Sequence, residues 1–109
     1  MWVAALCLKA GSATILRGGK EALNSNRLIA DTLVSAGRRT LGARFPEHAI
    51  QVVPTADRDA VPELLALTEY VDLCMPRGGE GLIRAVTQCS RVPVIILSAK
   101  SKEEDIIRG

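Results

Sequence analysis

Two pairs of glycines flanked by cations are the residues of this sequence best suited to chemistry. They are Arg17-Gly18-Gly19-Lys20 and, sixty positions later, Arg77-Gly78-Gly79. Each pair follows an apolar, β-forming segment and precedes a segment with helical periodicity. A glycine turn at the start of a helix directs backbone N–H groups and the positive end of the helix dipole toward one point. With the added charge of the arginines and Lys20, we interpret these stretches as two phosphate-binding loops that face one ligand.

A simpler interpretation is that the paired glycines only make two tight turns between strands and helices. Such turns do not need neighbouring cations, and both pairs have them, which favours phosphate binding. The dinucleotide fingerprint G-x-G-x-x-G is absent as written. Residues Gly78-Gly79-Glu80-Gly81 only approximate it.

No other residues point to a catalytic or metal site. The three cysteines, Cys7, Cys74 and Cys89, lack CxxC or metal-like spacing and lie among apolar neighbours. They are typical of reduced thiols in a cytosolic core. His48 is the only histidine and lies in a polar segment. The sequence therefore predicts neither a catalytic residue nor a metal ligand.

The composition indicates one α/β domain over residues 1–109. Apolar residues make up 48% of the 109 positions and aromatic residues 3%, so the core should be aliphatic. A net charge of +2 is too small to indicate binding to nucleic acid or to an anionic membrane. The first apolar run breaks at Lys9, far short of a membrane span. We expect a cytoplasmic protein.

The elements that would position the two loops follow from hydrophobic periodicity and breakers. Strands are expected over 13–16, 49–54, 70–75 and 92–97, and an irregular loop over 38–48. Helices are expected over 2–9, with a stop at Gly11, and from about 27 to 37, after a cap at Asn24, Ser25 or Asn26. A third helix follows a cap at Thr55, Asp57 or Asp59, with Pro62 in its first turn and Leu64, Leu65 and Leu67 buried. A fourth helix is expected over 81–89, and residues 102–108 form a last capped stretch that is too short to complete a helix.

This alternation predicts a three-layer α/β sandwich around a mostly parallel sheet of about four strands, Rossmann-like or flavodoxin-like. Ligands of such sheets bind beyond the carboxyl ends of the strands, where both glycine loops would lie.

The same residues resemble a known family, gamma-glutamyl phosphate reductase of the aldehyde dehydrogenase superfamily. The resemblance extends over about residues 4–95. Its motifs are Leu16-Arg17-Gly18-Gly19-Lys20-Glu21-Ala22-Leu23-Asn24-Ser25-Asn26-Arg27 and Met75-Pro76-Arg77-Gly78-Gly79-Glu80-Gly81-Leu82-Ile83-Arg84. The segment Tyr70-Val71-Asp72-Leu73, the turn Asp57-Arg58-Asp59 and the segment Arg91-Val92-Pro93-Val94-Ile95 also match.

The resemblance implies the cofactor-binding fragment of an NADP-dependent oxidoreductase of proline biosynthesis. That family reduces gamma-glutamyl phosphate to glutamate 5-semialdehyde and releases phosphate. Residues Arg17, Gly18, Gly19, Lys20 and Glu21 would flank the adenine ribose and its 2′-phosphate. Residues Arg77, Gly78, Gly79 and Gly81 would lie under the pyrophosphate. The implied partners are a dinucleotide and either the missing remainder of the enzyme or further copies of the chain.

Two features depart from that family. None of the three cysteines occupies the motif of the family's nucleophile, so the chain alone should be inactive. The pattern of the reductase family is lost after Ile95. Residues 92–105 instead resemble the fourth strand and following helix of a response-regulator receiver domain. Residues Asp72-Leu73-Cys74-Met75-Pro76 resemble the phosphoacceptor segment of that family. A receiver needs an acidic pair where this chain has Arg17. The alternatives are a non-catalytic receiver-like module or a chimera of the two.

Overall fold

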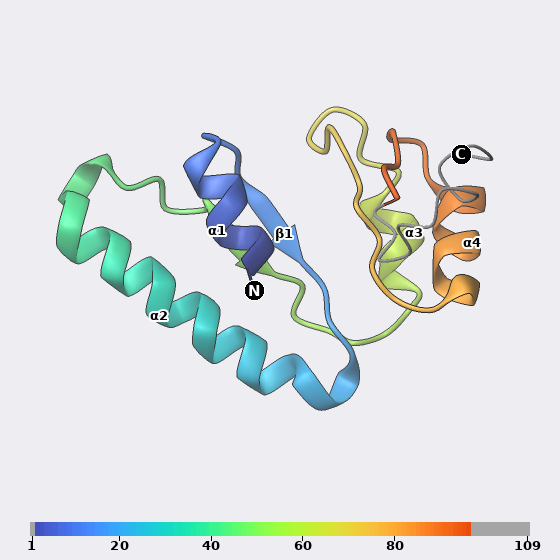
Figure 1. Ribbon diagram of the computed structural model, residues 1–109, viewed down its shortest axis with the longest axis horizontal. Coiled ribbons are helices and arrows are strands. Elements are labelled where there is room, and N and C mark those ends of the chain that lie inside the picture. The colour runs from blue at the N-terminus through green and yellow to red at the C-terminus, as the bar shows by residue number, and fades with distance from the viewer. Residues whose placement is uncertain (1, 97–109) are drawn as a thin grey trace, which may run out of the picture. The chain divides into compact units, whose positions relative to one another are not determined.

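The computed structural model describes residues 2–96, which belong to two compact units, Met1–Asp57 and Arg58–Gly109 (Figure 1). Each unit combines helices with extended, parallel-paired segments, and the predicted α/β class is confirmed. The incomplete helical stretch expected over 102–108 and the last residue of the strand expected over 92–97 lie outside the described residues. That the whole chain makes one domain stays a prediction.

The first unit opens with helix α1 (Trp2–Lys9), whose predicted bounds and glycine stop are confirmed. Gly11 has a φ of 82°, a backbone conformation that glycine adopts without steric conflict. Its N–H donates to the Leu8 carbonyl at 3.0 Å, and the Ser12 N–H donates to the Cys7 carbonyl at 2.8 Å. This pair of bonds is the Schellman motif, which satisfies the last carbonyls of the helix.

Strands β1 (Thr14–Leu16) and β2 (Ile50–Val52) form a two-stranded parallel sheet. Their register pairs Thr14 with Ile50 and Leu16 with Val52, and the Val53 N–H extends it by donating to the Leu16 carbonyl at 2.9 Å. Because the strands are parallel, their carboxyl ends lie at one edge. The first glycine loop starts at that edge.

Helix α2 (Leu23–Leu41) connects the two strands and is longer than the sequence predicted. A short 3-10 helix, η1 (Lys20–Ala22), leads into it, and neither helix has a side-chain cap hydrogen bond. The predicted cap at Asn24, Ser25 or Asn26 is therefore wrong. All three lie inside α2, because η1 already turns the chain into helical geometry at Lys20. The helix ends at Gly42, which has a φ of 58°, and not at Gly37.

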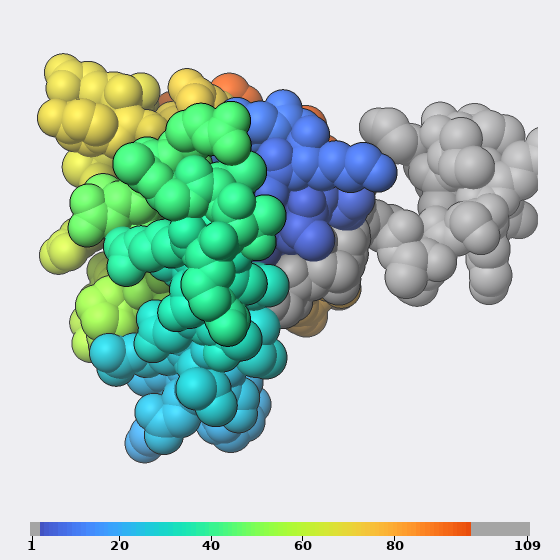
Figure 2. Space-filling model, turned by 90° about the vertical axis from the view of Figure 1, so that its left-hand side faces the viewer, coloured from blue at the N-terminus to red at the C-terminus, as the bar shows by residue number. Residues whose placement is uncertain are grey.

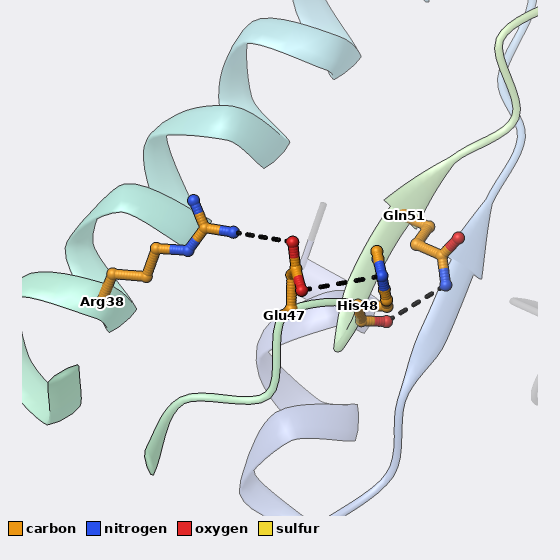
Figure 3. A network of polar contacts seen from close by, with 4 residues as sticks. All are labelled: Arg38, Glu47, His48 and Gln51. Atoms are coloured by element: carbon orange, nitrogen blue, oxygen red, sulfur yellow. Dashed lines mark hydrogen bonds and ion pairs between the residues drawn. The ribbon is translucent and has the colours of Figure 1, made fainter. Parts of the chain in front are cut away.

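Gly37 lies within α2, where its missing side chain leaves space for an aromatic ring. A Cβ at Gly37 would collide with the ring of Phe45, which follows the 3-10 helix η2 (Gly42–Arg44). The irregular loop expected over 38–48 is only partly confirmed: residues 38–41 belong to α2 and residues 42–44 to η2, whereas residues 45–48 are irregular. Figure 3 shows the polar contacts of Glu47 and His48, two exposed residues at the end of this segment. Arg38 Nη2 lies 3.8 Å from Glu47 Oε1, and Gln51 Nε2 donates to the His48 carbonyl at 3.2 Å.

The core of the first unit lies on one face of its sheet. Ala4 of α1, Ala30 of α2 and Ile50 of β2 form its buried cluster. The alternate strand positions are open to solvent, since Ile15 is 43% exposed and Gln51 is also exposed. The outer side of α2 is open as well (cyan to green in Figure 2). A three-layer sandwich is not confirmed by the described residues.

The second unit contains helices α3 (Ala60–Leu64) and α4 (Glu80–Cys89). Asp59 occupies the N-cap position of α3 but makes no side-chain cap hydrogen bond there, and Pro62 lies in the first turn of the helix, as predicted. The predicted leucine stripe is partly confirmed. Leu65 is 4% exposed and belongs to the core with Val86 and Val92, whereas Leu67 is 44% exposed.

The third and fourth predicted strands reduce to one parallel bridge between Cys74 and Val94. The Cys74 N–H donates to the Pro93 carbonyl and the Ile95 N–H donates to the Cys74 carbonyl, both at 2.9 Å. In a parallel ladder, the next donors on either side would be residues 76 and 93, and both are prolines. The two hydrogen bonds next to the bridge therefore cannot form, and the four-stranded sheet is not confirmed.

Among the described helices, none has both the length and the apolar character needed to cross a membrane.

Candidate functional site

The first glycine loop leaves the carboxyl end of β1 and is fixed by Arg17. The Arg17 side chain is half-buried, and its Nη2 donates to the carbonyl of Ala56 at 2.9 Å. Its Nε is buried without a hydrogen-bond partner among the described residues. Ala56 follows β2 at the same edge of the sheet. One guanidinium therefore connects the segments that follow the two parallel strands.

The two glycines of this loop make close backbone approaches. A Cβ at Gly18 would collide with the side-chain amide of Asn26, and one at Gly19 would come within 3.1 Å of the Glu21 carboxylate. Gly19 precedes η1 in extended geometry, and its carbonyl accepts the Ala22 N–H at 3.1 Å. Gly19, Lys20 and Glu21 are exposed, so the tip of the loop is accessible.

The second glycine loop precedes α4 and is exposed from Arg77 to Gly81. Gly78 has a φ of 150°, and a Cβ there would come within 2.8 Å of Leu82 Cδ2. Gly79 is the N-cap residue of α4, and its carbonyl accepts the Ile83 N–H at 3.2 Å. A Cβ at Gly79 or Gly81 would have no neighbouring atom within 4 Å. The surface over these two glycines is therefore open to a close approach by a ligand.

The second glycine of each pair has the same backbone conformation. Gly19 has φ −69° and ψ 164°, and Gly79 has φ −69° and ψ 165°. Each precedes a helical segment that has no side-chain cap hydrogen bond. The first N–H groups of both segments thus lack a side-chain acceptor at the cap, an arrangement that suits an anionic ligand. The loops belong to different units, and their convergence on one ligand stays a prediction.

The three thiols are free and half-buried. Burial raises the pKa of the Cys74 thiol, and the neighbouring charge of Cys89 raises this pKa further. Cys89 lies at the last position of α4, with its Sγ 3.7 Å from the Val86 carbonyl. Among residues 2–96, no three or more His, Cys, Asp or Glu side chains gather as metal ligands would. His48 lies in the exposed contacts of Figure 3, 4.0 Å from Glu47.

Sequence reasoning missed two groups that hold the first loop, the Ala56 carbonyl and the Asn26 side chain. The alternation of strands and helices was a usable signal for Ala56. It predicts a parallel sheet, and the residues that follow its two strands must then lie at the same edge of that sheet. The sequence has no comparable signal for Asn26, because its contact with Gly18 depends on where α2 begins. Asp72, the residue of the receiver-like alternative, is exposed and lies outside any strand.

No protein-family model matches this chain. Its sequence is 52% identical over 92 residues to the gamma-glutamyl phosphate reductase of Persephonella marina, covering 84% of this chain and 20% of that protein. The gamma-glutamyl phosphate reductase of Desulfatibacillum aliphaticivorans is also 52% identical over 92 residues, with 84% of this chain and 21% of that protein covered. The resemblance to this enzyme is confirmed, and the chain spans about a fifth of the length of these curated relatives.

Solved structures of the same enzyme share the fold. The crystal structure of gamma-glutamyl phosphate reductase from Thermotoga maritima matches with a TM-score of 0.78 and 39% identity, over 84% of this chain and 22% of that one. The Saccharomyces cerevisiae enzyme matches with a TM-score of 0.72 and 34% identity, over 85% of this chain and 23% of that one. Most of this chain is therefore similar in sequence and in fold to one segment of the enzyme.

Proposed function

We propose that this chain is the cofactor-binding segment of an NADP-dependent gamma-glutamyl phosphate reductase. The observation that carries the proposal is the 52% identity over 92 residues with proteins of that name. The complete enzyme would reduce gamma-glutamyl phosphate to glutamate 5-semialdehyde in the cytoplasm, as a step of proline biosynthesis. This segment would act there with the remainder of the enzyme or with further copies of itself.

The residues present fit a dinucleotide. In this proposal the second loop binds the pyrophosphate: Gly79 and Gly81 leave open space, and the N-terminus of α4 favours negative charge. The first loop binds the adenine ribose and its 2′-phosphate, with Lys20 as the exposed cation beside Gly19. Arg17 and Gly18 form the base of that loop, and Glu21 lies next to its tip. The bound cofactor supplies a hydride, and this segment holds and orients it.

Calorimetry of the purified chain with NADPH and with NADH tests the proposal. We expect NADPH to bind about tenfold or more tightly, because a charge-assisted contact to the 2′-phosphate contributes roughly 1.5–3 kcal/mol. Lys20→Ala should remove most of this preference. Arg39→Ala is the matched control, since it removes an exposed positive charge from the last turn of α2.

Equal affinities for the two cofactors, or no binding of either, would contradict the proposal. The receiver-like alternative predicts a different result in a second assay. Treatment with acetyl phosphate would then add a phosphoryl mass to the chain, and Asp72→Asn would remove that addition. The cofactor-binding proposal predicts no such mass shift.

A further inference from the structure

The guanidinium of Arg17 faces the protein along one edge. Nη2 is bonded to the Ala56 carbonyl at 2.9 Å, and Nε is buried. An arginine holds a phosphate most firmly when two N–H groups of one edge donate together. The Nε–Nη2 edge of Arg17 therefore faces the protein and is not open to a ligand.

The partner of Arg17 belongs to a segment that is itself fixed. The Val53 N–H donates to the Leu16 carbonyl at 2.9 Å, and this bond pairs the ends of β1 and β2 just before the loop. After Ala56, the Asp57 N–H donates to Thr55 Oγ1 at 3.1 Å. Arg17 therefore fastens the first loop to an ordered segment 39 residues further along the chain.

Lys20 has a different setting in the same loop. It is exposed at the first position of η1, beside the extended backbone of Gly19. Its ammonium is a compact charge on a flexible stem and can reach a ligand phosphate without disturbing the loop. The two cations of the loop thus have different surroundings, although the sequence gives them the same apparent role.

We propose that Arg17 is a positioning residue that fixes the first loop to the segment after β2, and that Lys20 is the residue that selects a 2′-phosphate. This inference rests on the proposed cofactor function. It assigns loop geometry to Arg17 and cofactor discrimination to Lys20. A positioning residue affects every cofactor that the loop binds, whereas a phosphate ligand affects only the cofactor that carries the phosphate.

Titration of variants with NADPH and NADH separates the two roles. Arg17→Ala and Arg17→Gln should weaken both cofactors by the same factor, about tenfold for one charge-assisted hydrogen bond, and leave their affinity ratio unchanged. Lys20→Ala should reduce that ratio, and Arg39→Ala should change neither affinity. A loss confined to NADPH in the Arg17 variants would overturn the inference. If the unmodified chain binds neither cofactor, the proposed function fails and the role of Lys20 fails with it, and the next measurement decides the positioning role of Arg17.

Proteolysis with a lysine-specific protease measures the positioning of the loop without cofactor. Lys20 reports on the loop, and Lys9, the exposed last residue of α1, is an internal reference. Arg17→Ala and Arg17→Gln should speed cleavage after Lys20 relative to Lys9 by about fivefold or more, because local opening sets the cleavage rate. Arg39→Ala should leave the ratio unchanged. An unchanged ratio in both Arg17 variants would overturn the inference, and far-UV circular dichroism shows whether each variant is folded.

Discussion

Gly78 and Gly79 are adjacent residues with opposite backbone requirements. Gly78 has a φ of 150°, which side-chain-bearing residues rarely adopt, and a Cβ there would press on Leu82. Gly79 has a φ of −69°, which any residue adopts, and its Cβ would meet nothing. Glycine is therefore required for the fold at position 78. At position 79 the backbone does not require glycine, and the open space there agrees with the proposed approach of a ligand.

We expect Gly78→Ala to lower the free energy of unfolding by about 1–3 kcal/mol, because it places a side chain in a strained backbone region. Gly79→Ala should lower it by less, about 0.5–1 kcal/mol, because the backbone there is unstrained but alanine is a poorer N-cap residue than glycine. Gly79→Val should abolish cofactor binding and preserve the far-UV circular dichroism spectrum. Urea denaturation and calorimetry measure these effects. Unfolding of Gly79→Val would instead assign a turn-forming role to this glycine.

At the residue scale, the sequence predicts which residues form the loops but not how their side chains are used. The charge of Arg17 was evident, yet the direction of its guanidinium depends on a carbonyl that a helix and a second strand separate from it. Cys74 shows the same limit. Its apolar neighbours predicted burial, but the influence of Cys89 on its pKa required the fold.

Among the elements, α2 shows how tertiary packing overrides a local signal. Glycine in a helix normally lowers stability by about 1 kcal/mol relative to alanine, which made Gly37 a reasonable predicted stop. Here Gly37 is retained inside the helix because the ring of Phe45 occupies the space of its side chain. The helix ends only at Gly42, where the backbone turns to positive φ.

Gly37→Ala should therefore destabilise the chain, by about 1–3 kcal/mol, because overpacking against Phe45 outweighs the gain in helix propensity. In a Phe45→Ala background the same substitution should become neutral or stabilising. Thermal or urea denaturation of the two single variants and the double variant gives the coupling between the two sites. Additive effects would show that the ring of Phe45 does not restrict position 37.

The elements that the sequence predicted well have a strong local signal at each end. Helix α1 ends at a glycine in the required conformation, and α4 follows a glycine pair. The two weakest predictions were the strands over 70–75 and 92–97. Their apolar composition suits strands, but Pro76 and Pro93 remove the donors that would extend pairing beyond the Cys74–Val94 bridge. Composition describes what a segment can bury, whereas pairing depends on donors in register.

On the scale of the whole molecule, each unit has a small core. Ala4, Ala30 and Ile50 are the buried cluster of the first unit, and Leu65, Val86 and Val92 are that of the second. Among the described residues, no large side chain is less than 2% exposed. Units of this size bury a small share of their surface and have narrow stability margins. Substitutions in these clusters should therefore be tested for folding before any effect is assigned to a site.

The last prediction is that the purified chain alone does not reduce gamma-glutamyl phosphate. The proposed reaction needs a thiolate to attack the acyl phosphate and carry a thioester that accepts hydride. Burial and Cys89 hold the pKa of Cys74 above its ordinary value, so its thiolate is disfavoured. Cys89 lies at the carboxyl end of α4, at the opposite end of this helix from Gly79 and its open loop. With NADPH and freshly generated gamma-glutamyl phosphate, the absorbance of the reduced nicotinamide should fall no faster than in buffer. Turnover that persists in Cys7→Ala but disappears in Cys89→Ala would contradict this and would identify Cys89 as a nucleophile.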